Sequence, residues 1–200
     1  SDSGHRFRRV EELLDSLGKI GPKSAALILR DRRGAGGKDI GMCNELSINQ
    51  LLAMHSVIFK PSSREIWVST SPWQCGEFIR FRLDDILDSP VPPYHRDSSK
   101  DIPEDIFLHS ESFRNLLKFK RSSAGIRSAI SSGTEIPEDS ISAYIGLNPL
   151  YYNAYNLAGD YFLAKGDEGN ACELWKKSLT FEMKLQERNL IEKKIGRYIR

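Results

Sequence analysis

The sequence has no apolar run that approaches the roughly 20 residues needed to cross a bilayer, so it predicts no membrane span. Its formal net charge is only +2, and it lacks the strong basic excess of a typical nucleic-acid-binding protein. Cysteine is scarce: Cys43, Cys75 and Cys172 lie far apart, without the close spacing of a zinc site, and we interpret them as buried thiols. With 40% hydrophobic residues, the composition is that of a folded, soluble protein.

The first forty residues predict two helices and a loop. Apolar residues recur at helical spacing over residues 6–17, and Gly18 follows where helices often end. Pro22 suits the first turn of a second helix, which we expect to end near Asp31. Residues 33–41 contain four glycines in nine positions, and this composition predicts a loop.

Residues 53–83 predict a small antiparallel sheet. The segments 53–60 and 64–71 are rich in β-branched and aromatic residues and are joined by a polar turn, which indicates a hairpin. A third strand over 77–83 places Ile79, Phe81 and Leu83 on one face and Arg80 and Arg82 on the other. Three strands make a thin sheet with an exposed edge, so we expect further strands from a segment absent here.

The remainder predicts a linker and a helical tail. Four prolines in a polar stretch mark residues 89–105 as a linker between a first domain, 1–88, and a second, 106–200. Six helical segments are expected in the second domain, and short connections imply that they pack antiparallel. They are predicted over these ranges: 111–121, 123–133, 138–147, 150–166, 169–183 and 185–200.

One part of the tail resembles a single tetratricopeptide repeat. Residues 154–179 place Ala158-Gly159 where that motif has its Leu-Gly pair, and Ala171 and Trp175 follow at matching intervals. Small residues at these positions let two helices approach closely while large ones fill the space between them. The proline that commonly closes the repeat is missing, and the alternative interpretation is a generic helical hairpin.

The first domain resembles the N-terminal-nucleophile hydrolases. Residues 3–10, SGHRFRRV, are similar to the Ser-x-x-Arg-Phe-x-Arg stretch of penicillin and bile-salt amidases. Residues 55–83, HSVIFKPSSREIWVSTSPWQCGEFIRFRL, are similar to the closing hairpin and strand of isopenicillin-N acyltransferases. The order and spacing of the strands agree with that family, and the resemblance covers about 85 residues. It implies an α+β protein with a partial αββα sandwich, followed by the all-α tail.

The same resemblance implies a cysteine that becomes the first residue of a chain after self-cleavage. Its α-amino group acts as the general base, and the thiolate forms an acyl-enzyme with an amide or acyl thioester. Arg6 matches the family's arginine that supports the nucleophile. This chemistry requires no metal and no organic cofactor, although coenzyme A could serve as an acyl donor.

This chain departs from the family because it has no amino-terminal cysteine. Ser1 is formally an N-terminal nucleophile, but the residues after it lead into a helix rather than a strand. We therefore expect the nucleophile on an upstream segment or subunit, which would be a partner of this chain. A small-molecule amide or acyl thioester would be the substrate.

Other residues favour structural interpretations. We interpret His55 as a hydrogen-bonded histidine of the sheet, and Asn44 and Asn49 as turn residues. His95 and His109 are expected to be exposed, and Asp84 and Asp85 are too close together for a spaced acid pair. Four aromatic residues could line an acyl pocket but fit a hydrophobic core better. They are Trp67, Trp73, Phe78 and Phe81.

The alternative to an enzyme part is an interaction module. In that hypothesis the helical tail presents its surface to a partner, or to a second copy of the chain in a homo-oligomer. More tetratricopeptide units upstream would favour this hypothesis. A cysteine at the start of an apolar strand upstream would favour the enzyme.

Overall fold

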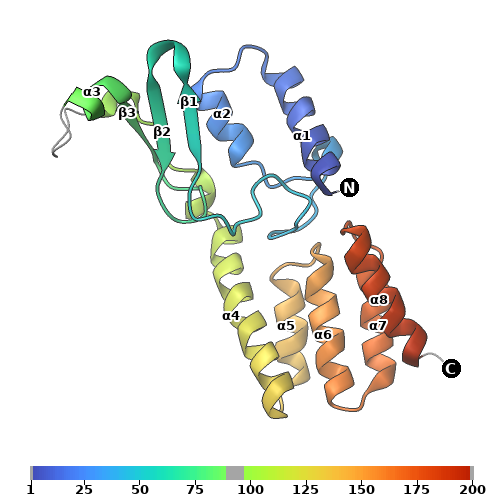
Figure 1. Cartoon of the computed structure of the whole chain (residues 1–200). Helices are drawn as coiled ribbons and strands as arrows, with labels where there is room; N and C mark the ends of the chain where they lie inside the picture. Colours follow the sequence, from blue (N-terminus) through green and yellow to red (C-terminus); the bar gives the residue numbers. More distant parts are fainter. Residues whose placement is uncertain (1, 89–96, 199–200) are drawn as a thin grey trace.

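The computed structural model describes residues 2–88 and 97–198, and it shows an α+β protein. A three-stranded sheet with α1, α2 and α3 forms one end, and α4–α8 form the other (Figure 1). The helices are α1 Asp2–Leu17, α2 Pro22–Leu29, α3 Leu83–Asp88, α4 Glu111–Ser132, α5 Glu138–Gly146, α6 Tyr152–Ala164, α7 Glu168–Ser178 and α8 Leu185–Tyr198. The strands are β1 Val57–Lys60, β2 Glu65–Ser69 and β3 Phe78–Arg82. No helix in the described residues is both long and apolar enough to cross a membrane.

The predicted hairpin and third strand are confirmed as a sheet of order β1-β2-β3, with both pairs antiparallel. The first strand is shorter than expected, because residues 53–56 precede β1 as irregular chain. A short turn at Pro61–Ser63 joins β1 to β2, and Arg64 adopts a left-handed backbone conformation with φ 52°. Because strand residues alternate between the two sides, the register sorts each strand's side chains onto two distinct faces.

The inner face of the sheet packs against α2. Its buried cluster joins Ala26 of α2 to Ile58, Trp67 and Phe78, one from each strand. Ile102, from the segment that follows the undescribed residues 89–96, completes the cluster. Polar residues also lie on this face, since Glu65, Ser69 and Arg80 are all buried there.

The described part of the predicted linker, residues 97–105, is packed rather than extended away from the fold. Ile102 pairs with Phe78 in both directions, with N–O distances of 2.9 and 3.0 Å. The indole Nε1 of Trp67 donates to the carbonyl oxygen of Lys100 at 3.0 Å. Within the described part, Ile102 supplies an apolar side chain to the core of the sheet. Residues 89–96 of the predicted linker lie outside the described residues.

The helical region has five helices where six segments were predicted. Segments 111–121 and 123–133 are one continuous helix, α4, with a continuous stripe of buried residues along its length. Ser110 caps its start by accepting a hydrogen bond from the backbone of Phe113, and Gly133 ends it in the left-handed conformation at φ 71°. The buried hydroxyl of Ser123 lies 3.2 Å from the Tyr144 hydroxyl, so this serine belongs to the packed face and does not break the helix.

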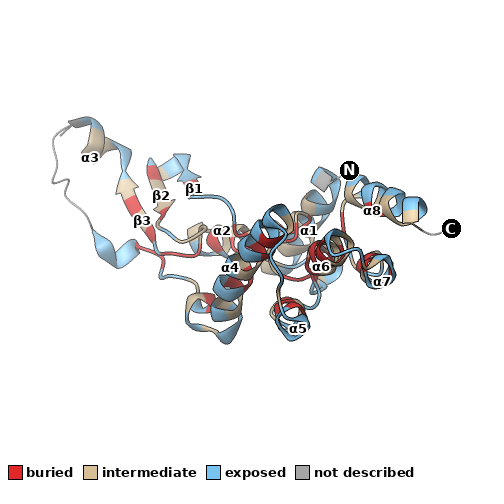
Figure 2. Ribbon diagram, turned by 90° about the horizontal axis from the view of Figure 1, so that it is seen from below, coloured by how far each residue is buried: buried red, intermediate tan, exposed pale blue. Residues whose placement is uncertain are grey.

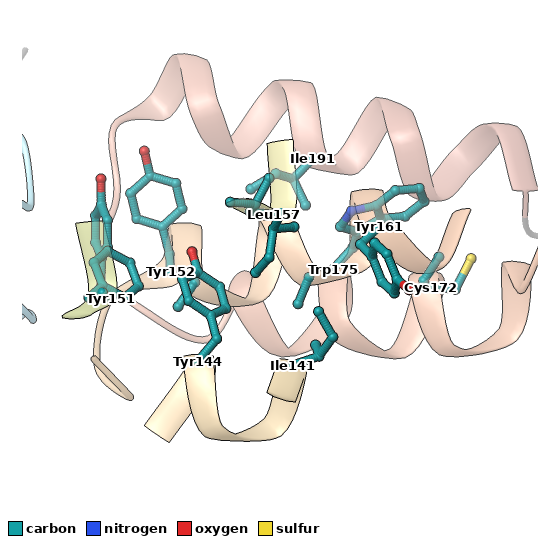
Figure 3. Packing of buried hydrophobic residues seen from close by; sticks show 14 of the residues in the cluster. Ile141, Tyr144, Tyr151, Tyr152, Leu157, Tyr161, Cys172, Trp175 and Ile191 are labelled. Carbon is teal, nitrogen blue, oxygen red and sulfur yellow. The ribbon is translucent and has the colours of Figure 1, made fainter. Parts of the chain in front are cut away.

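Helices α6 and α7 form the predicted hairpin, with Gly159 facing Trp175. A Cβ atom at Gly159 would lie 2.6 Å from the indole Nε1, so the close approach requires glycine. Trp175 is fully buried and lies within a cluster of sixteen buried residues drawn from α4 to α8 and their connections (Figure 3). The spacing of small and large residues correctly predicted this hairpin contact. Membership of the tetratricopeptide family stays a prediction.

The loop over residues 39–52 joins the two ends of the molecule. The side-chain amide of Asn148 both accepts from the Met42 backbone N–H at 3.0 Å and donates to the Met42 carbonyl at 2.9 Å. Gly41, at φ 79°, lies against the backbone of Tyr151, where a Cβ would come within 2.6 Å of the Tyr151 nitrogen. The glycine-rich composition of residues 33–41 correctly predicted a loop. It did not predict that Gly41 and Met42 would contact Tyr151 and Asn148 of the helical region.

Candidate functional site

Arg6, the residue matched to the family's supporting arginine, points toward the joining loop. Its Nη1 donates to the main-chain carbonyl oxygen of Glu45 at 2.7 Å. The structure thus places Arg6 where α1 meets the loop that connects sheet and helices. Its contribution to catalysis stays a prediction.

Glu45, whose backbone carbonyl accepts the Arg6 hydrogen bond, forms a cluster through its side chain with the phenol groups of Tyr151 and Tyr152. The Tyr152 hydroxyl donates to Glu45 Oε1 at 2.9 Å, and the Tyr151 hydroxyl lies 3.4 Å from the same atom. Burial, and then the nearby Glu45 carboxylate, raise the pKa of both tyrosines well above the ordinary value, so both are neutral donors. The other oxygen, Oε2, is buried without a hydrogen-bond partner in the described part of the chain.

The larger of two hollows near this loop has a volume of about 550 Å³ and lies between α2, the joining loop and the start of α4. Arg32, which lines this hollow, forms an ion pair with Asp105, with Nη1 2.6 Å from Oδ2. Its guanidinium also lies 4.0 Å from the centre of the Phe107 ring. Arg30 is buried beside it and donates to the carbonyl oxygens of Gly76 and Pro103 at 2.7 and 2.8 Å. Charged side chains of both signs therefore line this hollow.

The smaller hollow, of about 390 Å³, lies between α1 and the glycine-rich loop. Glu12 reaches across it, and both carboxylate oxygens accept from the Gly36 backbone N–H at 2.9 Å. That hydrogen bond, followed by the one from Arg9, lowers the pKa of Glu12. The Glu12 carboxylate thus takes up the Gly36 N–H group, and Arg8 and Lys38 are among the other residues that line the hollow.

None of the three cysteines is set up as a nucleophile. Cys75 and Cys172 are buried, as predicted, and Cys43 is half-buried. Burial raises the pKa of Cys43 and of Cys75, which favours the neutral thiol over the reactive thiolate. That the attacking group lies on another segment stays a prediction.

The asparagine and histidine residues singled out in the sequence lie in turns or on the surface, where the structure describes them. Asn44 and Asn49 are buried turn residues, because their side-chain oxygens accept from the backbone N–H two residues on, at 3.0 and 2.9 Å. The interpretation of His55 was wrong: it is exposed and precedes β1. His109 is exposed as expected, and His95 lies outside the described residues.

The four aromatic residues do not gather around one pocket. Trp67 and Phe78 belong to the sheet's inner core, and Trp73 packs in a different cluster with Phe107 and Phe113. Phe81 lies half-buried on the opposite face of β3. Their separation favours the core interpretation for Trp67 and Phe78 and gives no acyl pocket within the described residues.

Within residues 2–88 and 97–198, no group of three or more histidine, cysteine or acidic side chains could hold a metal ion. Sequence reasoning missed both hollows and the Glu45 cluster. The charged run from Arg30 to Arg33 was the one available signal for the larger hollow. No family model, curated protein or solved structure matches this chain.

Proposed function

We propose that this chain is the carboxy-terminal part of an N-terminal-nucleophile amide hydrolase or acyltransferase, whose attacking cysteine lies on an upstream segment or subunit. The proposal rests on the resemblance of residues 3–10 and 55–83 to that family. The substrate would be an amide or acyl thioester, and the reaction would pass through an acyl-enzyme.

The observation that carries the proposal is the outer face of the sheet. The register aligns Val57, Val68 and Ile79 in one row across the strands, and Phe59, Ile66 and Phe81 in a second. All six are apolar and exposed or half-buried, and none joins a buried cluster of the described residues. Buried positions alternate with half-buried ones along β2 and most of β3, and Figure 2 colours them red and tan.

A contiguous apolar face of this kind suits an interior surface better than a solvated one. In an αββα sandwich, two sheets pack face to face and each is covered by helices on its other side. Here α2 already covers the inner face. The outer face is therefore the one that a second sheet would cover, and the upstream segment would supply that sheet.

The state of the cysteines supports the same assignment. A chain that carried its own nucleophile would need a thiol with a lowered pKa and a nearby base. Burial raises the pKa of Cys43 and Cys75 instead. We assign to this chain the roles of completing the sheet, supporting the site through Arg6, and carrying the helical tail.

The test is to express the full coding sequence and measure the intact masses of the product. We expect two chains, one of which begins with cysteine, and a stoichiometric mass increase on that chain when an acyl thioester is added. Replacement of that cysteine by alanine should abolish both cleavage and acylation. A single uncut chain with no acylated cysteine would contradict the proposal.

The alternative, an interaction or oligomerisation module, is favoured by one observation in the tail. Helix α8 leaves Leu185 and Leu190 exposed, at 69% and 53% of their surface. Sedimentation of the 200-residue chain would decide this point. A dimer that a Leu185→Lys, Leu190→Lys variant converts to a monomer would favour self-association through α8, whereas a wild-type monomer would argue against it.

A further inference from the structure

The two edges of the sheet differ in their hydrogen bonding. One hydrogen bond next to the β1–β2 ladder shows which residues of β1 bond to β2. In it, the Ser69 N–H donates to the Ser56 carbonyl oxygen at 2.9 Å, so Ser56 and Ser69 form a bonded pair. Antiparallel pairs alternate between bonded and non-bonded residues. Ile58 and Lys60 therefore exchange hydrogen bonds with β2, and the N–H and C=O groups of Val57 and Phe59 point outward, away from β2.

The opposite edge is closed. The outward groups of Phe78 are paired with Ile102 in both directions, at 2.9 and 3.0 Å. The next outward N–H, that of Arg80, donates to the Asp101 carboxylate at 2.8 Å. Asp101 and Ile102 are both buried. A side-chain acceptor that takes up a strand N–H prevents another strand from pairing there.

At the β1 edge, by contrast, no described residue pairs with the outward groups of Val57 and Phe59. Their side chains are also exposed, at 36% and 67%. An unpaired edge of this kind is a template for another strand. The β1 edge is therefore open to a further strand, whereas the outward groups of Phe78 and the N–H of Arg80 on β3 are already paired.

Helix α1 provides the second observation. Figure 1 shows the elements in the order β3, β2, β1, with α2 and then α1 beyond β1. The apolar positions Phe7, Val10, Leu14 and Leu17 recur along one side of α1, yet Phe7 remains 63% exposed and Leu14 39%. No side chain described on α1 is fully buried. An amphipathic helix normally buries such a stripe against a sheet or another helix.

We propose that the β1 edge is the attachment site for an extended strand of the upstream segment, and that this strand and its neighbours cover the apolar stripe of α1. This inference rests on the proposed function, since it takes its partner from it. The added strand would bond to the outward N–H and C=O groups of Val57 and Phe59. Side chains of the added strands that contact this stripe would be apolar, because Phe7 and Leu14 are exposed on it.

The test uses the polypeptide encoded upstream of Ser1, produced as a separate tagged chain and mixed with the 200-residue chain. Proline at position 59 removes only an outward N–H, which an edge strand tolerates in the absence of a partner. We therefore expect Phe59→Pro to retain the circular dichroism spectrum of the wild type and to lose capture of the tagged chain. The controls are Phe59→Ala, which keeps the N–H, and Met54→Pro, in exposed chain before β1.

An amide-exchange measurement locates the contact even if Phe59→Pro fails to fold. In the wild-type chain alone, the amides of Val57 and Phe59 should exchange rapidly and that of Ile58 slowly. Binding of the upstream chain should slow exchange at Val57 and Phe59.

The outcomes separate the two proposals. If the upstream chain binds and carries an acylatable amino-terminal cysteine, but Val57 and Phe59 remain unprotected, the edge proposal is overturned while the proposed function stands. If no chain that begins with cysteine exists, the proposed function is wrong. The edge proposal is then wrong as well, because the strand it assigns to the β1 edge comes from that chain. If the 200-residue chain alone protects Val57 and Phe59 by forming a dimer, the edge belongs to a second copy and the inference is wrong.

Discussion

The sheet end and the helical end of this chain complete their cores to different degrees. The helical end buries sixteen residues in one cluster that draws on every helix from α4 to α8. The sheet end buries five in the cluster between α2 and the strands, and leaves six apolar side chains on the other face outside any cluster of the described residues. Stability from apolar burial follows the area removed from water.

This difference is what the proposed function predicts, because an additional layer would cover the outer face of the sheet. Two-layer packing needs a partner on each apolar face, and among the described residues a buried cluster covers the inner face of the sheet but not the outer one. The polar contacts agree, because the buried Arg80–Glu65 pair lies on the inner face, while the outer rows contain apolar residues alone. The following changes should affect the two ends unequally.

The largest effect is expected from Trp175→Ala in the helical end. Trp175 is fully buried between α6 and α7, and its Nε1 lies 3.1 Å from Asp160 Oδ1. Loss of the ring leaves a cavity and should lower the free energy of unfolding by about 3–5 kcal/mol. Urea denaturation followed by circular dichroism would measure it. A loss below about 1 kcal/mol would contradict a tightly packed helical core.

A comparable but more local effect is expected from Arg80→Met. The Nε atom of Arg80 donates to Glu65 Oε1 at 2.8 Å, and both side chains are buried. Removal of one partner leaves a buried carboxylate unpaired, which costs about 3 kcal/mol in comparable sites. Amide exchange should rise in β2 and β3 before it rises in α6. The Glu65→Gln, Arg80→Met double variant is the control and should recover part of the loss.

The same pair makes the sheet end sensitive to acid. The hydrogen bond from Ser63, together with Arg80, lowers the pKa of Glu65 against the opposing effect of burial. Because the folded pKa lies below the unfolded one, this contribution is complete above the ordinary glutamate pKa of about 4.3 and is lost as pH falls through the folded value. Unfolding midpoints from pH 7 to pH 2 should show the loss, and Glu65→Gln should flatten it. An unchanged slope in that variant would assign the acid sensitivity to other groups.

The smallest effect on the isolated chain is expected from Phe81→Gln on the outer face. Phe81 is half-buried and belongs to no buried cluster in the described residues, so the stability change should stay within about 0.5 kcal/mol. Fluorescence of a dye that binds apolar surface should fall, because the outer face loses an aromatic side chain. A large stability loss would show that the isolated chain already covers this face.

Local patterns predicted the elements well and their covering partners poorly. Residues 57–60, 65–69 and 78–82 form strands because β-branched and aromatic residues dominate them, and Gly159 opposite Trp175 follows from small and large residues at helical spacing. The predicted segments 111–121 and 123–133 are one helix, α4, in which the buried Ser123 hydroxyl contacts Tyr144 of α5. The contacts of Arg6 with Glu45, and of Met42 with Asn148, join residues 39 and 106 positions apart. Periodicity carries no information about contacts over that separation.

The reactivity of a cysteine placed on the outer face tests the central claim most directly. Val68 lies at the centre of the sheet in the row between Val57 and Ile79, so a Val68→Cys thiol reports on that face. The rate of its modification by a water-soluble disulfide reagent would be compared between the 200-residue chain and the complete parent protein. We predict rapid modification in the chain alone and strong protection in the parent, because another layer covers the face there. Equal rates in both would show that the outer face stays in solvent, and would contradict the account.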